Sequence, residues 1–273
     1  MTRILVRPPA LEDIPSWRTL GWRAEPDPIG LADEHARFRA VLENAGAEVI
    51  EARGEPGNLD SIYVYDPVLV TPQGAILLQP GKAGRRREPE ALAGDLPLPL
   101  LGRLEGDELA EGGDTVWLDE RTLLAGHTYR TNTPGIEALS RLLPDVDVFT
   151  FHLPHFHGRG EVLHLRSLLN PIAPKLVVGY LPLMPVPLVE LLEERGIQIV
   201  EVPDEEFETM GPNVLGLPAG RALALAGNRV TRQRLEDAGV EVLEYSGEEI
   251  SRKGDGGPTC LTLPVDFGAS SSS

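Results

Sequence analysis

The sequence predicts a single α/β domain, residues 1–266, in which five units of similar pattern form a closed ring. Each unit is expected to contain a β-hairpin, a helix and a further strand. Three observations predict this fold. Hairpin patterns end near Leu78, Ala125, Val178 and Ala226, at intervals of roughly fifty residues, which is typical of repeat architectures. Helix and strand patterns follow the later hairpins, and the two ends of the chain supply the elements of a fifth unit.

Four hairpins are expected from runs rich in apolar and β-branched residues, each divided by turn residues. The paired runs are residues 62–70 with 75–80, 114–118 with 122–126, 163–172 with 175–180, and 213–217 with 222–227. The turns contain Thr71 to Gly74, Asp119 and Glu120, Ala173 and Pro174, and Pro218 to Gly220. Glycine, proline and acidic residues reverse a chain tightly, so each pair of runs is expected to fold back on itself.

Helices and third strands complete the later units. One apolar helical face comprises Ile136, Leu139, Leu142 and Leu143, and another comprises Leu188, Leu191 and Leu192. Thr133 as a cap, followed by Pro134, indicates the start of the first of these helices. The third strands are expected at residues 146–151, 197–202 and 240–245. No helix or strand is assigned after the first hairpin.

The fifth unit is assembled from both ends of the chain. Residues 260–265 and 3–6 are expected to pair as its hairpin and so to close the ring. Its helix carries the apolar face Phe38, Val41, Leu42 and Ala45, ends at Gly46, and leads into a strand at residues 47–52. An ordinary α/β or α+β domain is the alternative to the ring.

Three stretches fall outside this scheme. Residues 8–30 mix Pro, Trp, Asp and Gly without a period, which indicates a loop over one face of the ring, a candidate lid. The segment GKAGRRREPE contains Lys82 and Arg85 to Arg87, and a solvated surface is favoured over substrate contact. The Ser-rich tail, residues 267–273, is expected to be disordered.

Composition and charge exclude several classes of partner. Of the 273 residues 41% are hydrophobic, enough for a sizeable core. The 25 basic and 42 acidic side chains give a net charge of -17, which opposes nucleic-acid binding and attracts cations. No apolar run suits a membrane span or a signal peptide, so no membrane partner is expected. A single cysteine cannot form an internal disulfide, and the chain is expected to be cytoplasmic.

Four residues are candidates for chemistry. Cys260, the only cysteine, begins an apolar strand after two glycines, where a substrate can reach it, although a lone cysteine is more often buried and inert. His164 lies between two leucines, so its side chain is expected on the face opposite them. Glu111 precedes two glycines in AEGGD. Asp66 interrupts an apolar run, where a buried acid needs a partner such as a ligand cation.

In combination these residues carry a family resemblance. The motifs DSIYVYDP, EGGD, RTN, LHLRS and GGPTCLT, in this order over residues 60–260, resemble those of the guanidino-modifying enzymes of the pentein superfamily. Among them the chain is most similar to the dimethylarginine dimethylaminohydrolases, or dimethylargininases. The resemblance implies a five-bladed αβ-propeller, in agreement with the five units. It also implies hydrolysis of N-methylated arginine to citrulline plus methylamine or dimethylamine, within arginine metabolism and with no cofactor.

The same resemblance implies a role for each matching residue. Cys260 matches the nucleophile, His164 the acid/base, and Glu111 the carboxylate that orients the histidine. The substrate-binding positions fall on Asp66 for the guanidinium and on Arg130 for the α-carboxylate. Further substrate-binding positions fall on Asp255, Asp60, Tyr65 and Arg86. The match within the run of three arginines does not single out one of them, and Arg86 is taken to represent it. Thiolate attack on the guanidinium carbon would give a thiouronium intermediate, which water then hydrolyses.

Two positions bear on the choice of substrate. Arginine deiminases usually carry an aspartate two residues after the catalytic histidine, where this chain has Arg166, and LHLRS is closer to the LHLKS of dimethylargininases, which favours the latter. Dimethylargininases commonly have Glu-Asp where this chain has Tyr65-Asp66, so one edge of the guanidinium would be recognised differently. An arginine deiminase, another guanidino or ureido hydrolase, or an amidinotransferase are therefore alternatives. A homodimer is also left open.

Two readings from other classes remain. His155 and His157, together with His152, form a histidine-rich segment in which alternate residues would share one face of a strand, as in a metal site. No acidic residue follows at a metal-hydrolase spacing, so a cluster near the lid without metal is favoured. A pentein fold without catalysis is the second reading, because fold alone does not establish function.

Overall fold

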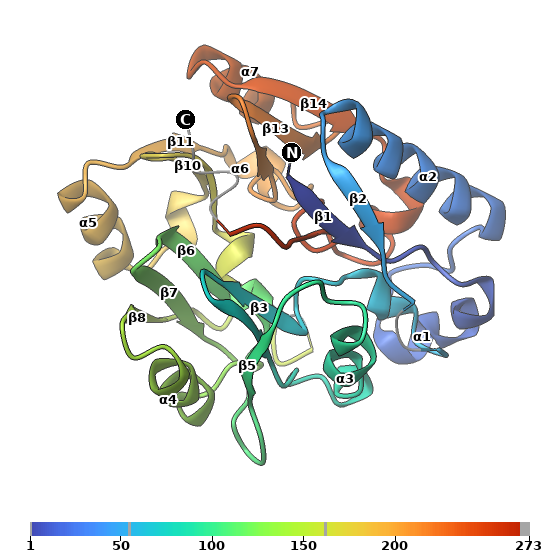
Figure 1. Cartoon of the computed structure of the whole chain (residues 1–273). Coiled ribbons are helices and arrows are strands. Elements are labelled where there is room, and N and C mark those ends of the chain that lie inside the picture. Colours follow the sequence, from blue (N-terminus) through green and yellow to red (C-terminus); the bar gives the residue numbers. More distant parts are fainter. Residues whose placement is uncertain (1, 54–55, 161–162, 268–273) are drawn as a thin grey trace.

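The structure, a computed structural model, describes residues 2–53, 56–160 and 163–267. Its strands form five three-stranded sheets arranged around a common centre (Figure 1). In each sheet the middle strand pairs antiparallel with one neighbour and parallel with the other, and a helix lies in the crossover between the parallel strands. The predicted propeller of five ββαβ units is thus confirmed.

The five units are numbered here in chain order, with the unit that closes the ring last. Unit 1 contains β3 (Val68–Thr71), β4 (Gly74–Leu77), α3 (Glu88–Ala93) and β5 (Leu100–Arg103). Unit 2 contains β6 (Thr115–Asp119), β7 (Thr122–His127), α4 (Thr133–Leu142) and β8 (Asp147–His152). Unit 3 contains β9 (Leu169–Ala173), β10 (Leu176–Gly179), α5 (Val186–Glu194) and β11 (Gln198–Glu201). Unit 4 contains β12 (Leu215–Leu217), β13 (Arg221–Leu225), α7 (Arg229–Asp237) and β14 (Glu241–Tyr245).

Unit 5 joins the two ends of the chain. It contains β15 (Leu263–Pro264), β1 (Arg3–Val6), α2 (Pro28–Asn44) and β2 (Glu48–Glu51). Leu5 pairs with Leu263 in the antiparallel ladder, and the Arg3 guanidinium lies 2.7 Å from a carboxylate oxygen of Asp266. This ion pair is partly exposed, so the ladder and the packing of Leu5 and Leu263 contribute more to closure.

The apolar side chains form clusters that each join neighbouring units, which leaves the centre of the ring for polar groups. Leu69 of unit 1 packs in one cluster with Leu123 of unit 2, and Phe38 of unit 5 packs in another with Leu223 of unit 4. The largest cluster joins units 2, 3 and 4. Truncation of such a residue to alanine typically costs about 2–5 kcal/mol of stability, so adjacent units stabilise one another.

Two parts of the fold differ from the sequence-based expectation. Unit 1 does contain a helix and a third strand, α3 and β5, which the sequence pattern did not reveal. The helix is short, and Leu100 and Leu101 of β5 are exposed, so neither element carries a clear apolar period. The other correction concerns residues 8–30, which include the helical turns η1 (Leu11–Ser16) and α1 (Trp17–Leu20) and the start of α2.

The start of α2 lies well before its apolar face. Asp27 caps this helix, because its carboxylate accepts a hydrogen bond from the backbone N–H of Gly30 at 2.7 Å, and Pro28 occupies the first turn. No helix in the described part of the chain combines the length and the apolar character that a membrane crossing requires. The shorter helices α6 (Asp204–Phe207) and η2 (Leu59–Ile62) lie in connections. The expected tail disorder concerns residues that, except for Phe267, lie outside the described ranges.

Candidate active site

Each of the five units contributes one polar side chain to a single region near the ring centre. Each side chain lies on the segment that precedes the first strand of its unit, and the five in order are Asp66, Glu111, His164, Asn213 and Cys260. All except Glu111 line one cavity of about 270 Å³, and Glu111 is fully buried next to it. The repeat therefore brings together residues that are up to about two hundred positions apart in the chain.

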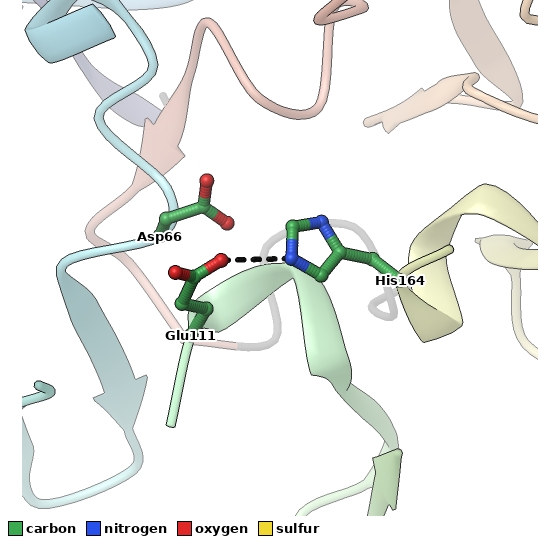
Figure 2. A group of neighbouring side chains, drawn as sticks. All are labelled: Asp66, Glu111 and His164. Atoms are coloured by element: carbon green, nitrogen blue, oxygen red, sulfur yellow. Dashed lines mark hydrogen bonds and ion pairs between the residues drawn. The ribbon is translucent and has the colours of Figure 1, made fainter. Parts of the chain in front are cut away.

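His164 and Glu111 form a tight pair at this cavity (Figure 2). The Nε2 atom of His164 lies 2.8 Å from a carboxylate oxygen of Glu111, which requires Nε2 to carry the proton. The other edge of the ring is directed away from Glu111, and the carboxylate of Asp66 lies nearby. Glu111 also forms an ion pair with Arg130, whose Nη1 atom lies 3.3 Å from a carboxylate oxygen. The carboxylate thus orients the imidazole and is itself neutralised.

The charges around this pair shift both pKa values. Burial alone would raise the pKa of Glu111, but the hydrogen bond from His164 and the charge of Arg130 lower it to about 2. Burial would lower the pKa of His164, but Asp114, Glu111 and Asp66 together raise it to about 9. At neutral pH the site therefore holds an imidazolium beside an ionised carboxylate, which makes His164 a proton donor.

Asp114, the last residue of EGGD, is a further group that the sequence analysis did not single out. It is fully buried, and its carboxylate accepts hydrogen bonds from the Thr128 hydroxyl at 2.7 Å and from the Leu165 backbone N–H at 3.1 Å. Burial raises the pKa of Asp114 to about 6, although the positive charge of His164 opposes that rise. Because Leu165 directly follows His164, Asp114 holds the histidine segment in place.

Cys260 precedes the first strand of unit 5, and His164 precedes the first strand of unit 3. The two residues nevertheless line the same cavity. The side-chain amide of Asn213 is 3.6 Å from Sγ. Burial and the negative charge of Asp66 raise the pKa of the Cys260 thiol, so these surroundings favour its protonated form. Gly257 permits this packing, since a Cβ there would lie only 2.4 Å from the Asn213 side chain.

Asp66 sits between the histidine and a buried arginine. Its carboxylate accepts a hydrogen bond from the Gly113 N–H at 2.9 Å and lies 2.5 Å from Nη1 of Arg85. Arg85 is itself almost fully buried and also pairs with Glu88 at 2.7 Å. The expectation of a solvated arginine run is therefore wrong for Arg85, because the turn at Ala83–Arg85 directs this one side chain inward.

The other predicted substrate-binding residues divide into two groups. Asp60, Arg130 and Asp255 line the catalytic cavity, together with Lys82, which forms an ion pair with Asp60 at 2.5 Å. Arg86 and Tyr65 do not. The structure corrects both expectations.

Arg86 is exposed on the turn that buries Arg85, and Tyr65 faces a second cavity, where its ring packs against Arg166. Adjacent residues in irregular segments carry no period, so the sequence could not say which of two neighbours faces the site.

The candidate lid lies against the cavity. Leu20, Gly21 and Arg23 line it, and the indole N–H of Trp22 donates a hydrogen bond to Asp60 at 2.8 Å. Arg23 forms an exposed ion pair with Asp255 at 2.9 Å. Residues 20–23 therefore contact the cavity region, and the lid role of residues 8–30 stays a prediction.

The histidine-rich segment does not form a metal cluster in the described part of the chain. His155 contacts the hydroxyl of Tyr129 at 2.6 Å, and His157 lies 3.6 Å from Glu208. His152 packs on His127 with ring centroids 4.6 Å apart. Within the described ranges, the metal-ligating side chains that gather closely are Asp66, Glu111 and His164, which already form the site described above.

Comparison with known proteins places the chain in a family. A family model described as eukaryotic N,N dimethylarginine dimethylhydrolase matches residues 30–266. The chain belongs to the dimethylargininase family. It is 26% identical to the N(G),N(G)-dimethylarginine dimethylaminohydrolase of Pseudomonas aeruginosa, over 95% of the chain and 98% of that protein. It is 28% identical to an arginine deiminase of Mycobacterium avium, over 57% of the chain and 46% of that protein.

Solved structures of the dimethylargininase family and of related enzymes share this fold. The P. aeruginosa enzyme, as a cysteine-to-serine mutant complexed with citrulline, superposes with a TM-score of 0.79 at 24% identity, covering 96% of this chain and 98% of that one. The product-bound N-terminal domain of ArgZ, a cyanobacterial arginine dihydrolase, gives a TM-score of 0.79 at 20% identity, covering 97% of each chain. As a dimethylargininase family member, the chain is a hydrolase of carbon–nitrogen bonds in amidines.

Proposed function

We propose that this enzyme hydrolyses the guanidino group of an N-methylated arginine to citrulline and methylamine or dimethylamine. One observation carries the proposal. The single cysteine and the His164–Glu111 pair meet at one cavity beside the carboxylate of Asp66. This combination supplies a nucleophile, a proton donor and an anion that can hold a guanidinium cation. The net charge of -17 also favours a cationic substrate.

Substrate binding would activate the nucleophile. The negative charge of Asp66 contributes to the raised pKa of Cys260. A guanidinium bound beside Asp66 offsets that charge, so binding lowers the pKa of the thiol and favours the thiolate. The thiol proton leaves to solvent, because His164 is already protonated near neutral pH. The enzyme is thus reactive mainly when the substrate is present.

The first half of the reaction forms a covalent intermediate. The Cys260 thiolate attacks the guanidinium carbon, and the tetrahedral intermediate collapses as the amine leaves. His164 donates its proton to that amine, which leaves a thiouronium attached to Cys260. Glu111 stabilises the imidazolium before this transfer and keeps its donor edge fixed. Asp66 keeps the cation in line with the thiolate.

The second half reverses the role of His164. The neutral imidazole takes a proton from water as the water attacks the thiouronium carbon. The second tetrahedral intermediate expels the Cys260 thiolate, its hydroxyl proton passes to solvent, and a ureido product is released. His164 is then protonated again, and the cycle is complete. Arg130, at the edge of the cavity, suits the α-carboxylate of an amino-acid substrate.

The choice among guanidino substrates rests on one further observation. Tyr65 lines the second cavity, so this position supplies no carboxylate to the catalytic cavity, unlike the glutamate common there in dimethylargininases. Unmethylated arginine or another guanidino compound is therefore the second candidate. A cytoplasmic location and a homodimer both stay predictions.

A substrate panel tests the proposal. Purified enzyme is incubated with arginine, mono- and dimethylated arginines, agmatine and citrulline, and ureido product, amine and ammonia are measured. We expect the highest kcat/KM for a methylated arginine. Cys260→Ser should abolish turnover, and quenched wild-type enzyme should show the thiouronium adduct by intact mass.

The chain offers a matched control in Ser140, a helical residue outside the cavity, so Ser140→Ala should keep the wild-type rate. Turnover by Cys260→Ser at the wild-type rate would contradict the mechanism. A preference for arginine would contradict only the substrate assignment.

A further inference from the structure

Arg166 joins three units of the ring through its guanidinium. Nε donates a hydrogen bond to the Thr115 carbonyl at 3.1 Å, and Nη1 donates to the side chain of Asn170 at 2.9 Å. Nη2 donates to the hydroxyl of Tyr65, whose ring lies 4.2 Å beneath the guanidinium carbon. All three nitrogens of the planar group are therefore engaged.

Each partner of Arg166 lies close in sequence to a residue of the site. Tyr65 precedes Asp66, and its backbone N–H donates to the carbonyl of Cys260 at 3.3 Å. Thr115 follows the last residue of EGGD. Asn170 donates to the carbonyl of Pro212 at 2.8 Å, immediately before Asn213. This hydrogen-bond circuit, made by Arg166, Tyr65, Thr115, Asn170, Pro212 and the backbone carbonyl of Cys260, reaches all five units.

The central residues of the circuit face a second cavity and not the catalytic cavity. Tyr65, Arg166 and Thr259 line a second cavity of about 150 Å³. The next residue of each, Asp66, Ser167 and Cys260, lines the catalytic cavity. The segments that carry the site thus separate two cavities, with the guanidinium of Arg166 on the side away from the substrate.

Tyr65 and Arg166 lie at the centre of the circuit. They contact each other through a hydrogen bond and a cation–π pair, so the two side chains act through one interaction.

We propose that Arg166, through Tyr65, Thr115 and Asn170, is a positioning residue that fixes the relative placement of Asp66, His164 and Cys260. The kinetic part of this proposal rests on the proposed function. A guanidinium has a rigid fork of donors, so it sets both the distance and the angle between the segments it joins. A displacement of about 1 Å in a catalytic group can lower the rate about 100-fold.

Arg166→Met, Arg166→Lys and Tyr65→Phe test the proposal. We expect Arg166→Met to lower kcat by about 10- to 100-fold with a smaller change in KM. Arg166→Lys keeps the positive charge but not the planar fork of donors, so its kcat should lie between that of the wild type and that of Arg166→Met. Tyr65→Phe removes one hydrogen bond and should lower kcat less. The effects of Tyr65→Phe and Arg166→Met should not add in the double variant, because both act through one contact.

A substrate-free measurement accompanies the kinetics. Cys260 is the only cysteine, so the rate of iodoacetamide alkylation against pH reports on this thiol alone. Displacement of Asp66 and His164 should shift that pH profile in Arg166→Met and, less, in Tyr65→Phe. The shift does not depend on which substrate the enzyme uses. A chain inactive on every guanidino compound but with a shifted profile would refute the proposed function and leave the positioning role standing.

Arg195→Met is the matched control. Arg195 makes the same kinds of contact on the rim of units 2 and 3, with a hydrogen bond to Thr122 at 2.9 Å and its guanidinium over the ring of Phe149. We expect a lower unfolding temperature with unchanged kcat and an unchanged alkylation profile. If Arg166→Met and Tyr65→Phe both behave like Arg195→Met, the positioning role is wrong.

Discussion

The imidazole of His164 lies 2.8 Å from the fully buried carboxylate of Glu111, in a contact between the segments that precede units 3 and 2. The pairing raises the pKa of His164 and lowers the pKa of Glu111, so the charged form of both groups is present over a wide pH range. A proton donor for the leaving amine is thereby held ready before the substrate arrives.

Glu111→Gln should weaken this donor. The variant keeps the shape of the side chain but removes a negative charge and an acceptor, so the pKa of His164 should fall from about 9 toward its ordinary value. We expect kcat to fall about 100-fold, and the alkaline limb of the pH–rate profile to move to lower pH. NMR titration of the His164 ring measures the pKa directly. Glu108→Gln, on the same segment but paired with Arg141 outside the site, should leave the profile unchanged.

Arg85 and its neighbour offer a matched pair of variants. Arg85→Met leaves Asp66 and Glu88 buried without their cation, and breaking a buried ion pair typically costs about 3–5 kcal/mol. We expect a large loss of unfolding free energy in urea and loss of turnover. Arg86→Met, at an exposed position, should change the unfolding free energy by no more than about 0.5 kcal/mol and the turnover rate by no more than about twofold. A large rise in KM for Arg86→Met would restore the sequence-based assignment of Arg86 to substrate binding.

Trp22→Phe tests the contribution of the candidate lid. The variant keeps an aromatic ring beside Tyr63 but removes the hydrogen bond to Asp60, which is worth about 1.5–3 kcal/mol when the acceptor is charged. We expect KM to rise several-fold, because Asp60 lines the cavity. Trp17→Phe, in the same segment but outside the cavity lining, is the control. Equal KM values for the two variants would exclude a role of this contact in substrate binding.

His35 makes stability sensitive to acid. It is buried in α2, its Nε2 has no hydrogen-bond partner among the residues that the structure describes, and burial lowers its pKa to about 4. Because the unfolded chain binds a proton near pH 6.5 and the folded chain does not, the unfolding free energy should fall as pH drops from 6.5 through 4, by about 3 kcal/mol in total.

His35→Leu should remove this pH-dependent part of the unfolding free energy, which urea unfolding at several pH values would detect. The exposed His157→Leu should keep the wild-type slope. Identical pH dependence in His35→Leu and the wild type would show that His35 titrates normally.

The sequence by itself determined the ring, its closure by the two ends, and the family. Periods of about 2 and 3.6 residues and the turn residues between them are local properties, so they identify a repeated unit without any knowledge of its neighbours. The motifs around Asp66, Glu111, His164 and Cys260 pointed to one site through their resemblance to a known family. That residues 1–266 form one domain stays a prediction.

Only the tertiary structure decided what each irregular segment does. It revealed α3 and β5, the helical turns within residues 8–30, and the burial of Arg85 in place of Arg86. It also turned Tyr65 away from the substrate cavity and onto Arg166. The segments before the first strand of each unit have no period, so the direction of a side chain there is set by contacts with other units. Asn213 was missed for that reason, although its place before β12 repeats that of the other site residues.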